Sequence, residues 1–185
     1  MYVLSNNTST SADEDDQHKP LVFFVACVDT KVDLVFVLDA STSVTENNFL
    51  VMKDFIKDFL FIADVDSGNA RVGIIIYSTE DHVQFNLNTY QNKVALFEAI
   101  DYIPYRYGST NTADALNTMR TQMFTAANGD RPGVPNVAIV ITDGVSNINS
   151  RRTIPEAEQA RAEGCLLYTS PSPRDFCRSR MPSSA

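Results

Sequence analysis

Three apolar runs of strand length constrain the fold of this 185-residue sequence: Asp33–Leu38, Arg71–Tyr77 and Val137–Ile141. Each run is rich in Val and Ile and nearly continuous, which is typical of strands buried on both faces of a parallel sheet. Four other segments carry apolar residues at helical spacing. These predicted helices span Glu46–Phe61, Tyr90–Tyr102, Thr112–Ala126 and Pro155–Glu163. Strands that alternate with helices indicate an α/β fold with a doubly wound, mostly parallel sheet.

Shorter patterns mark an edge strand and the ends of two helices. The alternating run Val83–Leu87 predicts a short strand at the edge of the sheet. Thr45 is the expected N-cap of the first helix. Pro155 in the first turn and Gly164 after the last turn delimit the final helix.

Composition narrows the classes of partner. The formal net charge is −8, which argues against a nucleic-acid backbone as ligand. No apolar run reaches the ~18 residues of a membrane-spanning helix. An apolar fraction of 44% is sufficient for the core of one globular domain.

A group of oxygen-bearing side chains follows the first strand directly. The segment Asp39–Ser43 reads Asp-Ala-Ser-Thr-Ser, so one carboxylate and two hydroxyls spaced two apart can converge on a hard cation. Ligand sets made only of oxygen suit Mg²⁺ or Mn²⁺ rather than zinc. Two more loops are rich in oxygen donors, at Thr142–Gly144 after the third strand and at Gly108–Thr112 before a helix. Because ligands of open α/β sheets bind beyond the carboxyl ends of the strands, we expect the first two loops to lie side by side.

Together the three loops resemble the von Willebrand factor A (VWA) domain, a Rossmann-like fold with a metal-ion-dependent adhesion site. The family pattern is D-x-S-x-S, a Thr in a distant loop and an Asp in a T-D-G turn, and the likeness covers Asp33–Gly164. The implied metal ligands are Asp39, Ser41, Ser43, Thr110 and Asp143. The resemblance implies that the hydroxyls coordinate directly and that the carboxylates act directly or through water. Thr112 is expected to cap the following helix instead.

This ligand set implies recognition rather than catalysis. Neutral hydroxyls and only two carboxylates leave Mg²⁺ or Mn²⁺ undercompensated, so an open coordination position still favours negative charge. A Glu or Asp of another protein would complete the shell. The expected partner is a matrix or cell-surface protein that presents an acidic residue, and the expected parent is a larger multidomain protein.

Two alternatives stay open from the residues alone. Asp39 and the two serines are also favoured helix-capping residues, and they would then need no metal. Arg151 and Arg152 follow the Thr142–Gly144 loop and either shape the choice of partner or are simply exposed surface.

The composition changes abruptly after Gly164. Residues 165–185 are a Ser/Pro/Arg mixture that resembles the translation of a sequencing adapter, so we treat them as a non-native tail; the alternative is a native Ser/Pro tail. Residues 33–164 are then a partial VWA domain, truncated after the helix that follows the fourth strand. We expect the tail to have no defined tertiary place, although Leu166–Tyr168 imitates a strand, and we expect the apolar edge at Val137–Ile141 to be exposed.

The N-terminal segment, residues 1–32, is acidic and polar with one short apolar run. Its composition is typical of a linker. The apolar run Leu21–Ala26 is either a linker strand or the core of a signal peptide, although acidic residues upstream are the wrong flank for the latter.

Three classes of function share features with this sequence. An extracellular adhesion or matrix domain is favoured, because Cys27–Leu38 looks most like matrilin and collagen VI-type A domains. In that branch a Cys before the first strand commonly pairs with one after the last helix. An intracellular VWA scaffold is the alternative, but such domains often lose the metal site. A phosphatase would need a second Asp two residues after the first, where this chain has Ser41, so no enzyme is expected.

Overall fold

The computed structural model describes residues 31–170, and the expectations for residues 1–30 and 171–185 lie outside this range. A five-stranded sheet with the order β3-β2-β1-β4-β5 forms the middle layer. Its strands are β1 (Val32–Asp39), β2 (Ala70–Tyr77), β3 (Asp81–Phe85), β4 (Asn136–Ile141) and β5 (Leu166–Ser170). All neighbouring pairs are parallel except β2 with β3, which confirms the mostly parallel sheet.

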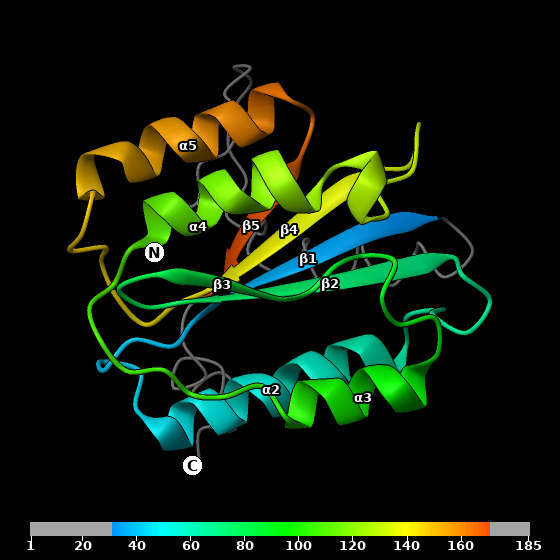
Figure 1. Ribbon diagram of the computed structural model, residues 1–185, viewed down its shortest axis with the longest axis horizontal. Helices are drawn as coiled ribbons and strands as arrows, with labels where there is room; N and C mark the ends of the chain where they lie inside the picture. Colours follow the sequence, from blue (N-terminus) through cyan, green and yellow to red (C-terminus); the bar gives the residue numbers. More distant parts are fainter. Residues whose placement is uncertain (1–30, 171–185) are drawn as a thin grey trace, which may run out of the picture.

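Helices cover both faces of the sheet, as Figure 1 shows. On one face lie α2 (Glu46–Phe61) and α3 (Lys93–Asp101). On the other face lie α4 (Thr112–Thr118) and α5 (Ser150–Ala162). A π-helical turn, Met119–Met123, extends α4 and is followed by a 3₁₀ turn at Ala126–Asn128. The structure therefore confirms the α/β, doubly wound architecture.

Alternate residues of β1 supply the two layers of the core. Leu34, Phe36 and Leu38 belong to the cluster packed against α2 and α3. Val35 and Val37 belong to the cluster on the α4 and α5 side. This division follows from the two-residue period of a strand, and it explains why the run reads as continuously apolar.

Several element ends differ from the sequence-based prediction. Asn111, not Thr112, caps α4, because its side chain accepts a hydrogen bond from the Asp114 amide. α5 begins at Ser150, so Pro155 lies inside the helix rather than in its first turn. The N-cap assigned to Thr45 is confirmed.

The segment after Gly164 does take a place in the sheet. β5 pairs in parallel with β4, from Val137 beside Leu166 to Ile141 beside Ser170. The expectation that the sheet stops at β4 is therefore wrong for Leu166–Ser170. The expectation that Val137–Ile141 forms an exposed edge is also wrong, because Val137 is 3% and Ile139 is 8% exposed. The physical reason is that any extended apolar segment can satisfy the backbone groups of an open strand edge; the adapter origin of this segment stays a prediction.

Within residues 31–170, no helix is both long and apolar enough to cross a membrane.

Candidate metal site

Sheet register brings the loops Asp39–Ser43 and Thr142–Gly144 together. Leu38 on β1 is paired with Ile141 on β4, so the next residues, Asp39 and Thr142, leave the sheet side by side. The Thr142 hydroxyl donates a 2.7 Å hydrogen bond to Asp39 Oδ2. The other carboxylate oxygen, Oδ1, accepts a 2.9 Å bond from the Ser41 amide. The Asp39 carboxylate is thus fixed at the switch point between β1 and β4, as predicted.

A row of oxygens continues from Asp39 towards solvent. The hydroxyls of Ser41 and Ser43 lie 3.0 Å apart. The Ser43 hydroxyl donates a 3.1 Å bond to Asp143 Oδ1, across 100 residues of sequence. Asp39 and Ser41 are buried, whereas Ser43 and Asp143 are exposed. Four of the five predicted ligands therefore converge, with a buried end and an open end.

The loop that carries Thr110 borders the same group. Thr42 and Gly108 exchange two hydrogen bonds, from the Thr42 amide to the Gly108 carbonyl at 3.0 Å and from the Gly108 amide to the Thr42 hydroxyl at 2.9 Å. Thr110 is 5% exposed. Its amide donates to Asn147 Oδ1, and its carbonyl accepts from the Ser146 hydroxyl. These contacts fix the Thr110 backbone, while its role as the third hydroxyl ligand stays a prediction.

The electrostatics of the site favour a bound cation. Burial raises the pKa of Asp39 and outweighs the hydrogen bonds from Ser41 and Thr142, and the nearby charge of Asp143 raises it further. A positive charge between the two carboxylates would remove both penalties. The Tyr77 phenol, paired with Asp39 in the sheet register, is fully buried, and burial raises its pKa so that it stays neutral.

The donor chemistry fits a hard cation. Across residues 31–170, no cluster of three or more His, Cys, Asp or Glu residues could hold a metal ion. The site relies instead on hydroxyls beside two carboxylates, which is an oxygen set of the kind that Mg²⁺ and Mn²⁺ accept. The alternative in which these residues merely cap the next helix loses its support, because Thr45 fills that role for α2.

Sequence reasoning missed several residues that position the ligands. Thr142 belongs to the predicted Thr-Asp-Gly turn, and its hydroxyl also anchors Asp39. The Tyr105 hydroxyl donates a 2.8 Å bond to the Ser41 carbonyl. Ser146 and Asn147 hold the Thr110 backbone. The order Thr-Asp-Gly was the one usable signal, because a hydroxyl next to a metal-site carboxylate commonly orients it.

The two arginines after the Thr142–Gly144 loop lie in different environments. Arg152 pairs with Asp114 and Glu156, each at 2.9 Å, and so joins α5 to α4. Arg151 is exposed.

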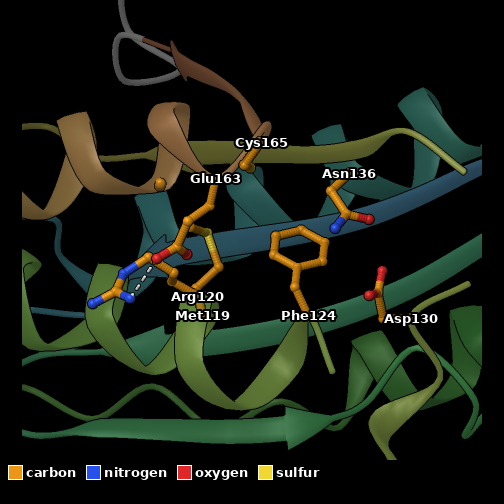
Figure 2. Close-up of a pocket in the computed structure, with 8 residues that line it drawn as sticks. Met119, Arg120, Phe124, Asp130, Asn136, Glu163 and Cys165 are labelled. Atoms are coloured by element: carbon orange, nitrogen blue, oxygen red, sulfur yellow. Dashed lines mark hydrogen bonds and ion pairs between the residues drawn. The ribbon is translucent and has the colours of Figure 1, made fainter. Parts of the chain in front are cut away.

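A separate pocket of about 190 Å³ lies at the amino end of β4, away from the metal site. Figure 2 shows Phe124, Asn136 and Asp130 at one side of it and the Arg120–Glu163 ion pair at the other. Asn136 Oδ1, Asp130 Oδ1 and Arg120 Nε are buried and lack protein partners. Burial raises the pKa of the Cys165 thiol in its wall to about 12. Buried water commonly forms hydrogen bonds with polar atoms of this kind, so these atoms do not by themselves indicate a ligand site.

Comparison with known proteins places the chain in a family. The family model described as "von Willebrand factor type A domain" matches residues 33–170, a range that includes β5. Vitrin from Mus musculus is 38% identical over 114 residues, which are 62% of this chain and 18% of vitrin. Matrilin-2 from Mus musculus is 34% identical over 146 residues, which are 77% of this chain and 15% of matrilin-2. The collagen alpha-6(VI) chain from Mus musculus is 33% identical over 144 residues, covering 78% of this chain and 6% of that one.

These relatives are extracellular matrix proteins, which agrees with the extracellular localisation expected from the sequence. The chain spans less than a fifth of the length of each.

Among solved structures, proximal thread matrix protein 1 from the mussel byssus, described with a zinc-occupied MIDAS motif, superposes with a TM-score of 0.72 and 26% identity. The match covers 76% of this chain and 38% of that one. Manganese-loaded TRAP protein from Plasmodium vivax shares the fold with a TM-score of 0.66 at 17% identity, over 84% of this chain and 65% of that one. By its sequence, its sheet order and its match over residues 33–170, the chain belongs to the von Willebrand factor type A domain family.

Proposed function

We propose that this domain binds a matrix or cell-surface protein through a divalent cation that bridges to a carboxylate of the partner. The cation would be held by Asp39, Ser41, Ser43, Thr110 and Asp143. Its chemical contribution is a positive charge with a free coordination position. The domain would thus act in adhesion and assembly, as one unit of a larger extracellular protein.

The observation that carries the proposal is that the oxygen row has one buried end and one exposed end. Asp39 is 0% and Ser41 is 1% exposed, so one side of the site is closed by the protein. Ser43 and Asp143 are exposed, so the other side faces solvent. A cation held between them would have protein ligands on one side and a position open to another molecule on the other. The open coordination position can accept an oxygen donor from another molecule, and a carboxylate is a strong donor of this kind.

Mg²⁺ or Mn²⁺ is the proposed occupant, although the mussel relative is described with zinc at its site. Zinc binds most nitrogen, oxygen and sulfur sites more tightly than manganese does, whatever the physiological metal is. Zinc in that relative is therefore compatible with a magnesium or manganese function here.

No catalytic role is proposed for the site. The exposed end presents a hydroxyl and a carboxylate that bind each other, Ser43 and Asp143. The sequence has Ser41 where a phosphatase of the Asp-x-Asp type needs its second carboxylate. An intracellular scaffold domain is the alternative function, and the similarity to matrix proteins disfavours it.

The test measures cation binding and carboxylate binding on the full 185-residue chain. Mn²⁺ is titrated and followed by its electron paramagnetic resonance signal, with Asp143→Ala as the site variant. We expect a loss of Mn²⁺ affinity of at least about tenfold, because a charged ligand is removed. Asp58→Ala is the matched control, since it removes an exposed carboxylate of α2. Equal Mn²⁺ binding by both variants would rule out the site.

A further inference from the structure

Two large apolar side chains project from the loops around the metal site. Tyr107 is 56% exposed and Val145 is 88% exposed. Val145 lies two residues after Asp143, the carboxylate at the open end of the site. Tyr107 directly precedes Gly108, which is bonded to Thr42 in the metal loop.

Both side chains belong to segments that are hydrogen-bonded around Thr110. Tyr107 is three residues before Thr110 in the chain. Val145 is next to Ser146, whose hydroxyl donates a 3.1 Å bond to the Thr110 carbonyl. The loops that border the oxygen row thus carry one exposed aromatic and one exposed aliphatic side chain.

The Tyr107 ring packs against a second aromatic ring although it is exposed. Its ring centroid lies 4.4 Å from that of Tyr105, which in turn lies 5.5 Å from that of Phe49. Phe49 is 1% exposed, and the Tyr105 hydroxyl is bonded to the Ser41 carbonyl. The stack thus connects Tyr107 to the core and to the metal loop. A side chain ordered in advance loses little entropy when a partner binds it.

The backbone of Tyr107 is strained. Its φ is 58°, in the left-handed region that a bulky residue rarely adopts. Glycine would fit this conformation at lower cost, and the exposed ring contributes little burial in return. Strained residues of this kind concentrate where a protein contacts ligands.

We propose that Tyr107 and Val145 form an apolar contact surface beside the cation, which selects partner segments whose metal-binding carboxylate has apolar neighbours. This inference rests on the proposed function. The cation would take the carboxylate, and the two side chains would take the residues around it. In an extended segment, side chains two residues apart point to the same side. The preferred partner segment therefore has apolar residues two positions before and two positions after the acidic one.

Three capped peptides immobilised at high density on a sensor surface test this preference. They are Leu-Gly-Glu-Gly-Leu, Ser-Gly-Glu-Gly-Ser and Leu-Gly-Gln-Gly-Leu, and the full chain is flowed over them in Mg²⁺ or in EDTA. We expect the leucine–glutamate peptide to bind at least about fivefold more tightly than the serine–glutamate peptide, because two apolar side chains leave water. Binding is expected to vanish with the glutamine peptide and in EDTA.

Variants then assign the preference to the two residues. Tyr107→Ser with Val145→Ser should remove the difference between the glutamate peptides and leave the Mn²⁺ affinity within about twofold of wild type. Tyr107→Gly fits the left-handed backbone but lacks the ring, so it should lose selectivity as the serine variant does if the ring makes the contact. Val94→Ser is the control, since Val94 is 80% exposed on α3 and outside the metal loops.

The outcomes distinguish the two proposals. Equal binding of both glutamate peptides, or a preference that survives in the double variant, overturns this inference and leaves the metal bridge intact. Failure of the wild-type chain to bind either glutamate peptide while it still binds Mn²⁺ overturns the carboxylate bridge and this inference with it.

Discussion

The Thr142 hydroxyl donates a 2.7 Å hydrogen bond to Oδ2 of Asp39, between residues 103 positions apart in the sequence. The same hydroxyl accepts a 3.2 Å bond from the Gly144 amide, so it joins the carboxylate to the turn that carries Asp143. One side chain thus sets the relative position of both carboxylates of the metal site.

Removal of this hydroxyl should weaken metal binding. In Thr142→Val the Asp39 carboxylate loses its anchor while the side chain keeps its shape. We expect about tenfold weaker Mn²⁺ binding, a size typical of residues that orient metal ligands. Thr142→Ser, which keeps the hydroxyl, is the control and should stay close to wild type. Unchanged affinity in Thr142→Val, measured by Mn²⁺ titration, would show that Asp39 needs no anchor.

At the other end of β1, an ion pair secures the start of the sheet. Arg131 Nε lies 2.8 Å from Asp33 Oδ1, and Asp33 is fully buried. The same guanidinium donates to the carbonyls of Gly68, Val32 and Asn69, and so joins the loops before β2 and β4 to β1. Arg131→Met leaves a buried carboxylate without its cation and should lower the free energy of unfolding by about 3–5 kcal/mol.

Urea denaturation of Arg131→Met and of Asp33→Asn/Arg131→Met tests this prediction. The double variant removes the uncompensated charge, so it should be more stable than the single variant. A double variant that is equally unstable would mean that the lost hydrogen bonds to the loops, and not the buried charge, set the cost.

The strands and the metal loop were predictable because their signals are local. The apolar runs, their helical neighbours and the segment Asp39–Ser43 can each be recognised within a few residues of sequence. The ends of elements were harder. α5 starts after Asn149, a residue type favoured at N-caps, but with φ of 52° its side chain makes no capping bond and donates instead to Asp114.

The positioning contacts were not predictable for a different reason. The bond between Tyr105 and Ser41 spans 64 residues, and it depends on how a loop folds back over the sheet. β5 is a third case. The strand-like run Leu166–Tyr168 and the apolar edge at Val137–Ile141 are both visible in the sequence, but the Ser/Pro/Arg composition of the tail predicted no tertiary place for the run.

Acid should destabilise the contact between α4 and α5. Burial tends to raise the pKa of Glu156, but hydrogen bonds from Arg152, Asn117 and Arg120 outweigh it, and the net pKa lies below the ordinary 4.5. A carboxyl whose pKa is lowered by folding stabilises the folded state above its unfolded pKa, and this contribution is lost as the pH falls through the folded value.

We therefore expect Glu156→Gln to reduce the loss of stability between about pH 6 and about pH 3, measured as the shift in urea midpoint. The control Glu158→Gln changes an exposed residue of the same helix and should keep the wild-type slope. Identical slopes for all three proteins would contradict the assigned role of Glu156.

Two glycines of one loop should respond differently to alanine. Gly129 has φ of 100°, and a Cβ there would lie 2.6 Å from the Asn88 backbone nitrogen. Gly133 has φ of 74° but open space around it. Gly133→Ala should therefore be destabilised only by the left-handed backbone, by about 1–2 kcal/mol. Gly129→Ala has the same backbone cost and also a clash with backbone that must move. It should be at least about 1 kcal/mol less stable than Gly133→Ala. Thermal and urea unfolding of both variants measure the difference. Equal stability would show that the loop beside Asn88 yields freely, so that backbone conformation alone selects glycine at position 129.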